Sequence, residues 1–294
     1  MNIIVLISTP VQLKGEDIDL EMNKPDLLAE RISLHFQEIK NRSYPLLLEK
    51  EEVKEVLKKL KGQSDSFYLL DEADDEIQGI CGYYIVEKEK YLQTTIFVSL
   101  NYNEKFIKKS LDYLRETYPG YTINIGVEAE NVFIIDELKN NGYWIIDDLY
   151  SATIKPNLIN SQTYSDIEEI DLAQWENFKE IHQQNFGQGY WNFQRIKDNF
   201  DIWKIYSIKE TNGIKSYVYV KSSSKDDSCE IFGICGENFD YRLRLIEHAL
   251  ASLKDKKLMY YFIEDEKEKE ACKELGFEVH GHYQAWEFKE EGLD

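Results

Sequence analysis

The chain repeats itself at an offset of 134 residues, and this repeat limits the folds that it can adopt. The run Gly79–Val86 aligns with Gly213–Val220, and the same offset then aligns residues 131–143 with residues 265–277. A repeat of this length indicates duplicated globular domains, because the units of solenoid proteins run to roughly 20–50 residues. We therefore predict two copies of one α/β domain that share one constant offset.

The hydrophobic pattern predicts the same order of elements, β-α-α-β-β-β-α-β-α-β, in both copies. Antiparallel hairpins that lead into a βαβ crossover predict an α/β fold, in which each copy is a mixed, mostly antiparallel sheet flanked by helices. A polar segment with one proline separates the copies. We predict an N-terminal domain over residues 1–154, a linker over 155–164 and a C-terminal domain over 165–294.

Composition narrows the classes of partner. The chain has 294 residues and a formal net charge of −20, which disfavours nucleic acid and anionic membranes and favours cationic small molecules. It contains no transmembrane run, and its start lacks the basic region of a signal peptide. The four cysteines show no CxxC spacing. They are typical of reduced thiols, so we expect a cytoplasmic protein.

The end of each copy carries a pattern of strand, helix and glycine–aromatic pair. In the first copy Val127-Glu128-Ala129-Glu130-Asn131 precedes Gly142-Tyr143, and in the second Ile263-Glu264-Asp265 precedes Gly276-Phe277. Together with the element order, this pattern resembles the GNAT superfamily of acyl-CoA-dependent N-acetyltransferases. The resemblance covers nearly the whole chain. It implies that acetyl-CoA is the co-substrate and that an acetyl group passes to an amine.

Members of this superfamily bind the pyrophosphate of CoA at a glycine-containing loop that opens a helix, where backbone N–H groups are free. In the first copy Glu104 and Phe106 stand where the glycines would be, and they would repel or crowd a pyrophosphate. In the second copy Asn238 can replace a glycine, although Asp240 opposes a phosphate. The resemblance assigns cofactor contacts to Ile234, Asn238, Asp240, Tyr241, Arg242 and Arg244, and to Asn131 in the first copy.

The resemblance also implies catalytic residues in the C-terminal copy. Glu230 stands where some members carry a general base, and the 134-residue offset pairs it with Ile96. Tyr283 is assigned to the substrate cleft of the same copy. Leu138 and Cys272 occupy the place of the family's proton-donating tyrosine, and neither is a credible replacement. His280 and His282 have no third ligand at suitable spacing, so we predict no metal site.

These observations predict an acyl-CoA-dependent N-acetyltransferase whose C-terminal copy acts on a small-molecule or peptide amine. The aromatic run 190–193 beside Glu230 would suit a cationic amine. The alternative is a pair of degenerate GNAT-like domains that serve only for binding or dimerisation, and the missing glycines and tyrosines favour it. The acceptor, the acyl chain length and the oligomeric state stay open, with a homodimer as one alternative.

Overall fold

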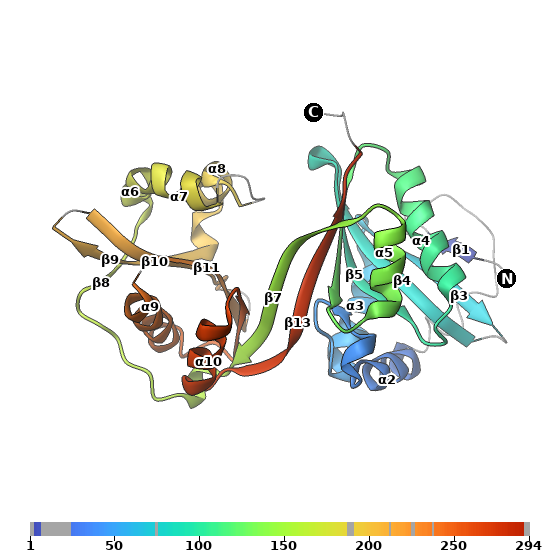
Figure 1. The fold of residues 1–294 in the computed structure, drawn as a ribbon, viewed down its shortest axis with the longest axis horizontal. Helices are drawn as coiled ribbons and strands as arrows, with labels where there is room; N and C mark the ends of the chain where they lie inside the picture. The colour runs from blue at the N-terminus through green and yellow to red at the C-terminus, as the bar shows by residue number, and fades with distance from the viewer. Residues whose placement is uncertain are drawn as a thin grey trace. The chain divides into compact units, whose positions relative to one another are not determined.

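A computed structural model of the chain describes residues 3–6, 25–73, 76–186, 191–211, 213–224, 227–236 and 238–290. Contacts divide the chain into two compact units (Figure 1). Unit 1 holds residues 1–148 together with the C-terminal segment 281–294, and unit 2 holds residues 149–280. No helix in the described ranges has the length and apolar character needed to cross a lipid bilayer.

Unit 1 is a mixed sheet with helices on both faces. Its strands follow the order β1-β3-β4-β5-β6-β13, in which only β5 and β6 run parallel. The strands are β1 (Ile3–Leu6), β2 (Ser43–Tyr44), β3 (Ser66–Ala73), β4 (Glu76–Val86), β5 (Tyr91–Ser99), β6 (Thr122–Glu128) and β13 (Glu278–Phe288). The helices are α2 (Pro25–Phe36), α3 (Lys50–Gly62), α4 (Glu104–Thr117) and α5 (Val132–Asn140).

Unit 2 repeats this plan with the strand order β8-β9-β10-β11-β12-β7, and here only β11 and β12 run parallel. The shared order confirms the predicted fold class of two similar mixed sheets. The strands are β7 (Trp144–Ile154), β8 (Ile167–Glu169), β9 (Trp203–Glu210), β10 (Gly213–Lys221), β11 (Ser228–Gly236) and β12 (Leu258–Ile263). The helices are α6 (Leu172–Trp175), α7 (Lys179–Phe186), α8 (Phe193–Asp198), α9 (Phe239–Ser252) and α10 (Glu266–Glu274).

Each sheet separates two apolar clusters, as alternating strand side chains require. In unit 1 the helices α2 and α3 pack on one face, and α4 and α5 pack on the other. In unit 2 the helices α6 to α8 cover one face with an aromatic cluster, and α9 and α10 cover the other. The two faces therefore offer different surroundings to the side chains that alternate along each strand.

The last strand of each half of the sequence completes the sheet of the other half. The C-terminal part of β7, residues 150–154, pairs with β12 in unit 2, whereas residues 283–288 of β13 pair with β6 in unit 1. The predicted domains are contiguous and keep each last strand with its own half. The units differ from that division because the two last strands are exchanged.

The constant offset of 134 residues is wrong for the central strands. The offset holds for the last helices, since α5 begins at Val132 and α10 at Glu266. The central β-bulges, however, fall at Thr95 in β5 and at Phe232 in β11, which are 137 residues apart. The connection after the bulged strand accounts for two of these three residues, because α4 and α9 begin 135 residues apart. Four residues join β5 to α4, but only two join β11 to α9.

The corrected offset gives Glu230 a new counterpart. Glu230 lies opposite Lys221 in the β10–β11 pair, and Gln93 lies opposite Tyr84 at the equivalent position of the β4–β5 pair. The counterpart of Glu230 is therefore Gln93 and not Ile96, so unit 1 carries a neutral amide of the same shape.

The strand exchange predicts that a residue near the C-terminus stabilises unit 1. Trp286 of β13 is 2% exposed and packs in the apolar cluster formed with α4 and α5. Trp286→Ala should destabilise unit 1 by about 3–5 kcal/mol, the usual cost of removing a buried aromatic ring. Hydrogen exchange of the β6 amides in increasing urea measures this change.

Trp144→Ala is the matched control, because Trp144 of β7 is 43% exposed and its loss should leave β6 exchange nearly unchanged. Unaltered β6 exchange in Trp286→Ala would contradict the exchange of strands.

Candidate functional site

The two parallel strands of unit 2 pair at their beginnings and then separate. Residues 228–231 of β11 pair with residues 258–261 of β12, and no further pairing between these strands occurs among the described residues. A β-bulge at Phe232 follows at once, because Ile231 and Gly233 face consecutive residues of β10. Bulges re-aim strands and often lie beside functional sites. Beyond Ile231 the backbone of β11 therefore borders a gap between the two strands.

The corresponding gap in unit 1 is filled by the chain itself. β5 and β6 pair only over residues 91–93 and 122–124, and β2 then pairs with β6 through Ser43 and Tyr44. The Ser43 hydroxyl accepts a hydrogen bond of 3.0 Å from the Phe97 backbone N–H of β5. The two residues of β2 thus bridge both strands where they separate, which leaves this gap closed.

Phe106, which we expected to crowd the helix start in unit 1, has a different place. Its ring is buried between Phe97 and Gly79 in the core. Asn103 caps α4 by accepting a hydrogen bond from the Phe106 backbone N–H. Phe106 therefore does not cover the helix start. The segment that fills the gap of unit 1 is β2.

Glu230 lies on β11 directly before the bulge. Its side chain is half-buried, and burial raises the pKa of its carboxyl, whereas the charge of Lys221 acts in the opposite direction. A carboxylate with a raised pKa is a better proton acceptor near neutral pH than an ordinary glutamate. The structure thus gives the predicted base surroundings that suit proton transfer.

An aromatic group lines the same side of the sheet as Glu230. Trp191 packs edge-on against Trp203, with ring centroids 5.2 Å apart, and Trp203 packs in the same way against Phe232 at 5.5 Å. The Lys221 ammonium lies 4.9 Å from the centroid of the Trp191 ring. An ammonium group thus already lies over an aromatic face beside Glu230, which is the arrangement that attracts cations. Tyr190, which belongs to the predicted aromatic run, lies outside the described residues.

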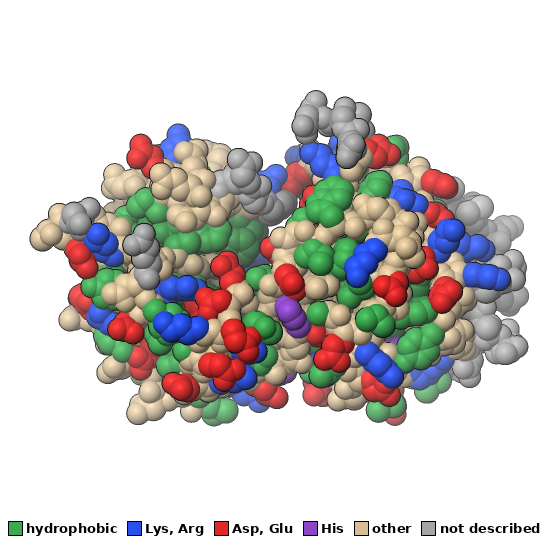
Figure 2. Space-filling model, viewed as in Figure 1, with side chains coloured by type: hydrophobic (Ala, Val, Ile, Leu, Met, Phe, Trp, Pro, Cys, Tyr) green, Lys and Arg blue, Asp and Glu red, His purple; other side chains and the backbone are tan. Residues whose placement is uncertain are grey.

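Further apolar groups surround this corner. A Cβ atom at Gly233 would lie 2.6 Å from the ring of Phe186, so only glycine allows this ring to cover the bulge. His182 is buried, with Nδ1 3.1 Å from the Tyr219 hydroxyl and Nε2 3.1 Å from the Trp191 carbonyl oxygen. Burial lowers the pKa of His182, so it contributes a neutral ring. Figure 2 shows apolar side chains gathered on the visible face of unit 2.

Most of the predicted cofactor residues lie around the start of α9. Asn238 caps the helix, and its side-chain oxygen accepts from the N–H groups of Asp240 and Tyr241. The Tyr241 hydroxyl donates to Glu210 over 2.9 Å, and Arg244 pairs with Asp166 over 2.5 Å. Ile234 follows the bulge on β11 and packs against the apolar cluster under α9. The helix start therefore lies beside the gap, but several of its polar groups already have partners within the protein.

Arg242 lies behind the gap rather than on the surface. Its guanidinium donates to the carboxylate of Glu268 on α10, and it lies 3.7 Å from Asp265. Cys272 follows Glu268 by one helical turn and is also buried, and burial raises the pKa of its thiol. Arg242 thus joins the helices that follow β11 and β12.

The structure places two predicted residues in unit 1, apart from Glu230. Asn131 caps α5 and donates from its side chain to the carbonyl oxygen of Arg42. Tyr283 lies on β13, where its ring meets that of Tyr44 at 4.8 Å. The strand exchange is the reason, because it moves residues 283–288 into the sheet of unit 1. Tyr283 and Glu230 therefore do not share a site within one unit.

Glu128 is a buried carboxylate of unit 1 that the sequence did not single out. It accepts from the Tyr44 hydroxyl over 3.1 Å and from the His282 backbone N–H over 2.5 Å. Burial raises the pKa of its carboxyl, and these two hydrogen bonds act in the opposite direction. Its bond to Tyr44 holds β2 in the gap.

Glu230→Gln should stabilise the folded protein at neutral pH. Burial raises the folded pKa of Glu230 above its ordinary value of 4.5, so the folded state binds the proton more tightly than the unfolded state. This raised pKa costs stability as the pH rises from the ordinary value through the folded value. The gain from Glu230→Gln should vanish below the ordinary pKa, and it should be complete above the folded one.

Urea denaturation of both proteins between pH 3.5 and 8 measures this difference. Hydrogen exchange of the β11 amides serves as the probe of unfolding. A gain that is independent of pH would contradict the burial of the charged form. Gln93 in unit 1 shows that the fold accepts glutamine at this position.

Comparisons with known proteins support the fold. No protein-family model and no curated protein matches the sequence. A GCN5-related N-acetyltransferase from Sphaerobacter thermophilus matches with a TM-score of 0.61 at 11% identity, over 91% of this chain and 93% of that chain.

Two further solved structures match over nearly the whole chain. A tandem GNAT protein from the clavulanic acid biosynthesis pathway has a TM-score of 0.50 at 10% identity, and 98% of each chain is covered. A glucosamine N-acetyltransferase region of a fungal multi-domain protein has a TM-score of 0.54 at 13% identity, over 98% of this chain and 38% of that chain. The chain therefore has the tandem fold of the GNAT N-acetyltransferases.

Proposed function

We propose that unit 2 is an acyl-CoA-dependent N-acetyltransferase that acts at the gap between β11 and β12. The observation that carries the proposal is the position of Glu230. Its half-buried carboxyl with a raised pKa precedes the bulge, and an ammonium group lies beside it over the Trp191 ring. This combination joins a proton acceptor to surroundings that attract an amine.

The fit to acetyl-CoA differs between the units. In unit 2 the edge of β11 from Phe232 to Gly236 borders the gap, and its backbone groups suit an extended arm. The start of α9, from Asn238 to Tyr241, would hold the phosphates through backbone N–H groups. In unit 1 the fit fails, because β2 occupies the gap. When bound, acetyl-CoA supplies the acetyl thioester.

Glu230 acts as the base in this proposal. It takes a proton from the substrate ammonium, directly or through water, and leaves a neutral amine. The amine nitrogen would then form the amide bond as the C–S bond of the thioester breaks, and the CoA sulfur would leave as a thiol after taking a proton from the attacking amine or from water. Trp191, Trp203 and Phe232 favour a cationic acceptor. We therefore propose a small-molecule or peptide amine as the substrate. Buried Cys272 has a raised thiol pKa, so we assign it no proton transfer.

A second function is supported for unit 1. The closed gap and the buried Glu128–Tyr44 contact favour a degenerate copy that stabilises the chain and binds no co-substrate. In this arrangement unit 1 corresponds to the non-catalytic alternative, and unit 2 corresponds to the enzyme. The cytoplasmic location and the homodimer stay predictions.

Glu230→Gln should lower turnover roughly 100-fold, the lower end of what a positioned general base contributes. The loss should be largest below the pKa of the acceptor amine, where the ammonium form dominates. Acetylation of a panel of polyamines, aminoglycosides and amino acids supplies the acceptor and the rate. Cys272→Ala is the control and should retain the wild-type rate. Equal rates for Glu230→Gln and wild type across pH 6–9 would remove Glu230 as the base.

Acetyl-CoA should bind with a stoichiometry of one per chain, because β2 closes the gap of unit 1. Calorimetry of the full chain measures this number. Two equivalent sites would contradict the proposed division between the units. The absence of binding would favour the non-catalytic alternative for both units.

A further inference from the structure

The pair Arg242–Glu268 is buried but only partly satisfied. The Glu268 side chain is 0% exposed and the Arg242 side chain is 18% exposed. One guanidinium N–H group meets one carboxylate oxygen, whereas Arg242 Nε and Glu268 Oε1 have no hydrogen-bond partner in the described protein. Buried polar atoms without a partner are costly and rare, so each calls for an explanation.

This pair interacts with residues of both strands that border the gap. On the β12 side, burial raises the pKa of Glu268, while Arg242 and a hydrogen bond with Tyr261 lower it. On the β11 side, burial raises the pKa of Cys235, and the charge of Arg242 counters this effect. Tyr261 is the last residue of β12 that pairs with β11, and Cys235 lies beyond the bulge. The unpartnered atoms therefore lie where strand pairing has ended.

Unit 1 carries no charge at the equivalent positions. Under the structural correspondence of the helices and strands, Arg242, Glu268 and Tyr261 correspond to Ile107, Ile134 and Ile125, and these three isoleucines lie in one apolar cluster. Apolar side chains often replace a buried ion pair without loss of stability. The fold thus does not need charges at this place.

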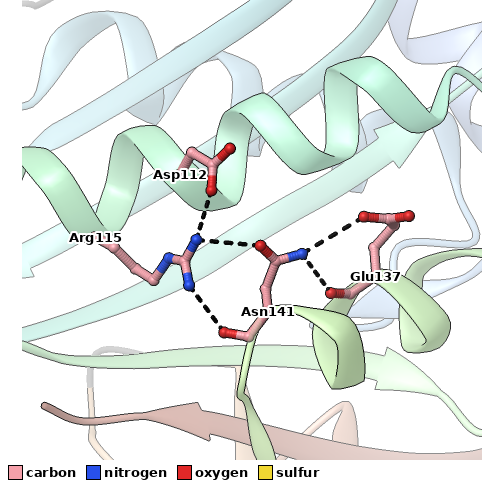
Figure 3. A network of polar contacts seen from close by, with 4 residues as sticks. All are labelled: Asp112, Arg115, Glu137 and Asn141. Atoms are coloured by element: carbon pink, nitrogen blue, oxygen red, sulfur yellow. Dashed lines mark hydrogen bonds and ion pairs between the residues drawn. The ribbon is translucent and has the colours of Figure 1, made fainter.

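A polar contact joins the last two helices of each unit, but it lies at opposite ends of the helices in the two units. In unit 1 Arg115 of α4 donates to the carbonyl and side-chain oxygens of Asn141 at the end of α5, over 3.0 and 3.1 Å (Figure 3). The equivalent positions of unit 2 carry Leu250 and Leu275. The polar contact of unit 2 therefore lies at the other end of the two helices, near the gap.

We propose that Arg242 and Glu268 recognise a secondary amide of the ligand that enters this gap. An amide carbonyl accepts from the unpartnered Arg242 Nε–H, and the amide N–H donates to the unpartnered Glu268 Oε1. A secondary amide offers this donor and acceptor side by side, as the pair requires. The inference rests on the proposed function when the ligand is acetyl-CoA, whose arm carries two such amides.

The test uses the full chain and two probes, acetyl-CoA and pantetheine, which carries the amides without the nucleotide. The variant R242I/E268I copies unit 1 and removes both recognising groups. It should raise the Kd at least tenfold, on the scale of two lost hydrogen bonds. The control K197A/E176A removes the Lys197–Glu176 ion pair of unit 2 and should bind like wild type. Should the isoleucine variant fail to fold, E268Q retains the shape and should still raise the Kd at least tenfold.

The outcomes separate the two proposals. The amide site is supported if R242I/E268I or E268Q binds acetyl-CoA more weakly than wild type while the control K197A/E176A binds it like wild type. Unchanged affinity for whichever probe wild type binds overturns it, and the unpartnered atoms then hold only solvent. If wild type binds pantetheine but not acetyl-CoA, and the variants weaken that binding, the amide site stands while the proposed function fails. If wild type binds neither probe, both proposals fail.

Discussion

The pairing of β13 with β6 and of β7 with β12 is the constraint on which both units depend. Each pairing adds a strand beside the strand that borders a gap, and each contributes apolar side chains to the core of that unit. Trp286 lies in the core of unit 1, and Ala152 and Ile154 lie in the core of unit 2. Neither half of the sequence therefore holds a complete sheet of its own.

The two units differ in what lies at the gap between their separating parallel strands. Parallel strands that separate after a few residues leave backbone groups to be satisfied. Unit 1 satisfies them with two residues of its own chain, which Glu128 holds through Tyr44. Unit 2 instead places a half-satisfied ion pair on one side of its gap, and Glu230 with an aromatic wall on the other. Under the proposed function, duplication leaves one copy as a scaffold while the other carries the site.

The sequence predicted the fold well, because hydrophobic period and turn residues report local structure directly. The element order and the mixed sheet followed from these signals. Asn238 caps α9 with an extended backbone, and not with the left-handed conformation expected of a residue that replaces a glycine. The strand exchange could not be predicted. The sequences of β7 and β13 are typical of ordinary last strands, and the local sequence does not indicate which strand each of them pairs with. The same exchange placed Tyr283 in unit 1, although its sequence position had assigned it to the C-terminal site.

The residues of the proposed site followed only in part from the sequence. Glu230 was selected by its place in the family pattern. The alignment by a constant offset did not identify Gln93 as its counterpart, because a change in loop length can be located only once the pairing register of the strands is known. Glu268 carried a usable signal. It stands one helical turn before Cys272 on the apolar face of α10, where a charged residue needs a partner. That partner, Arg242, lies on another helix, and only the folded chain shows that the two meet.

Hydrogen exchange with and without acetyl-CoA tests the central claim most directly, namely that the gap of unit 2 is the working site. The account predicts that acetyl-CoA slows exchange of the β11 amides of residues 232–236, which border the gap, and leaves residues 95–99 of β5 unchanged. Slower exchange in β5, or no change in β11 at saturating acetyl-CoA, would contradict it.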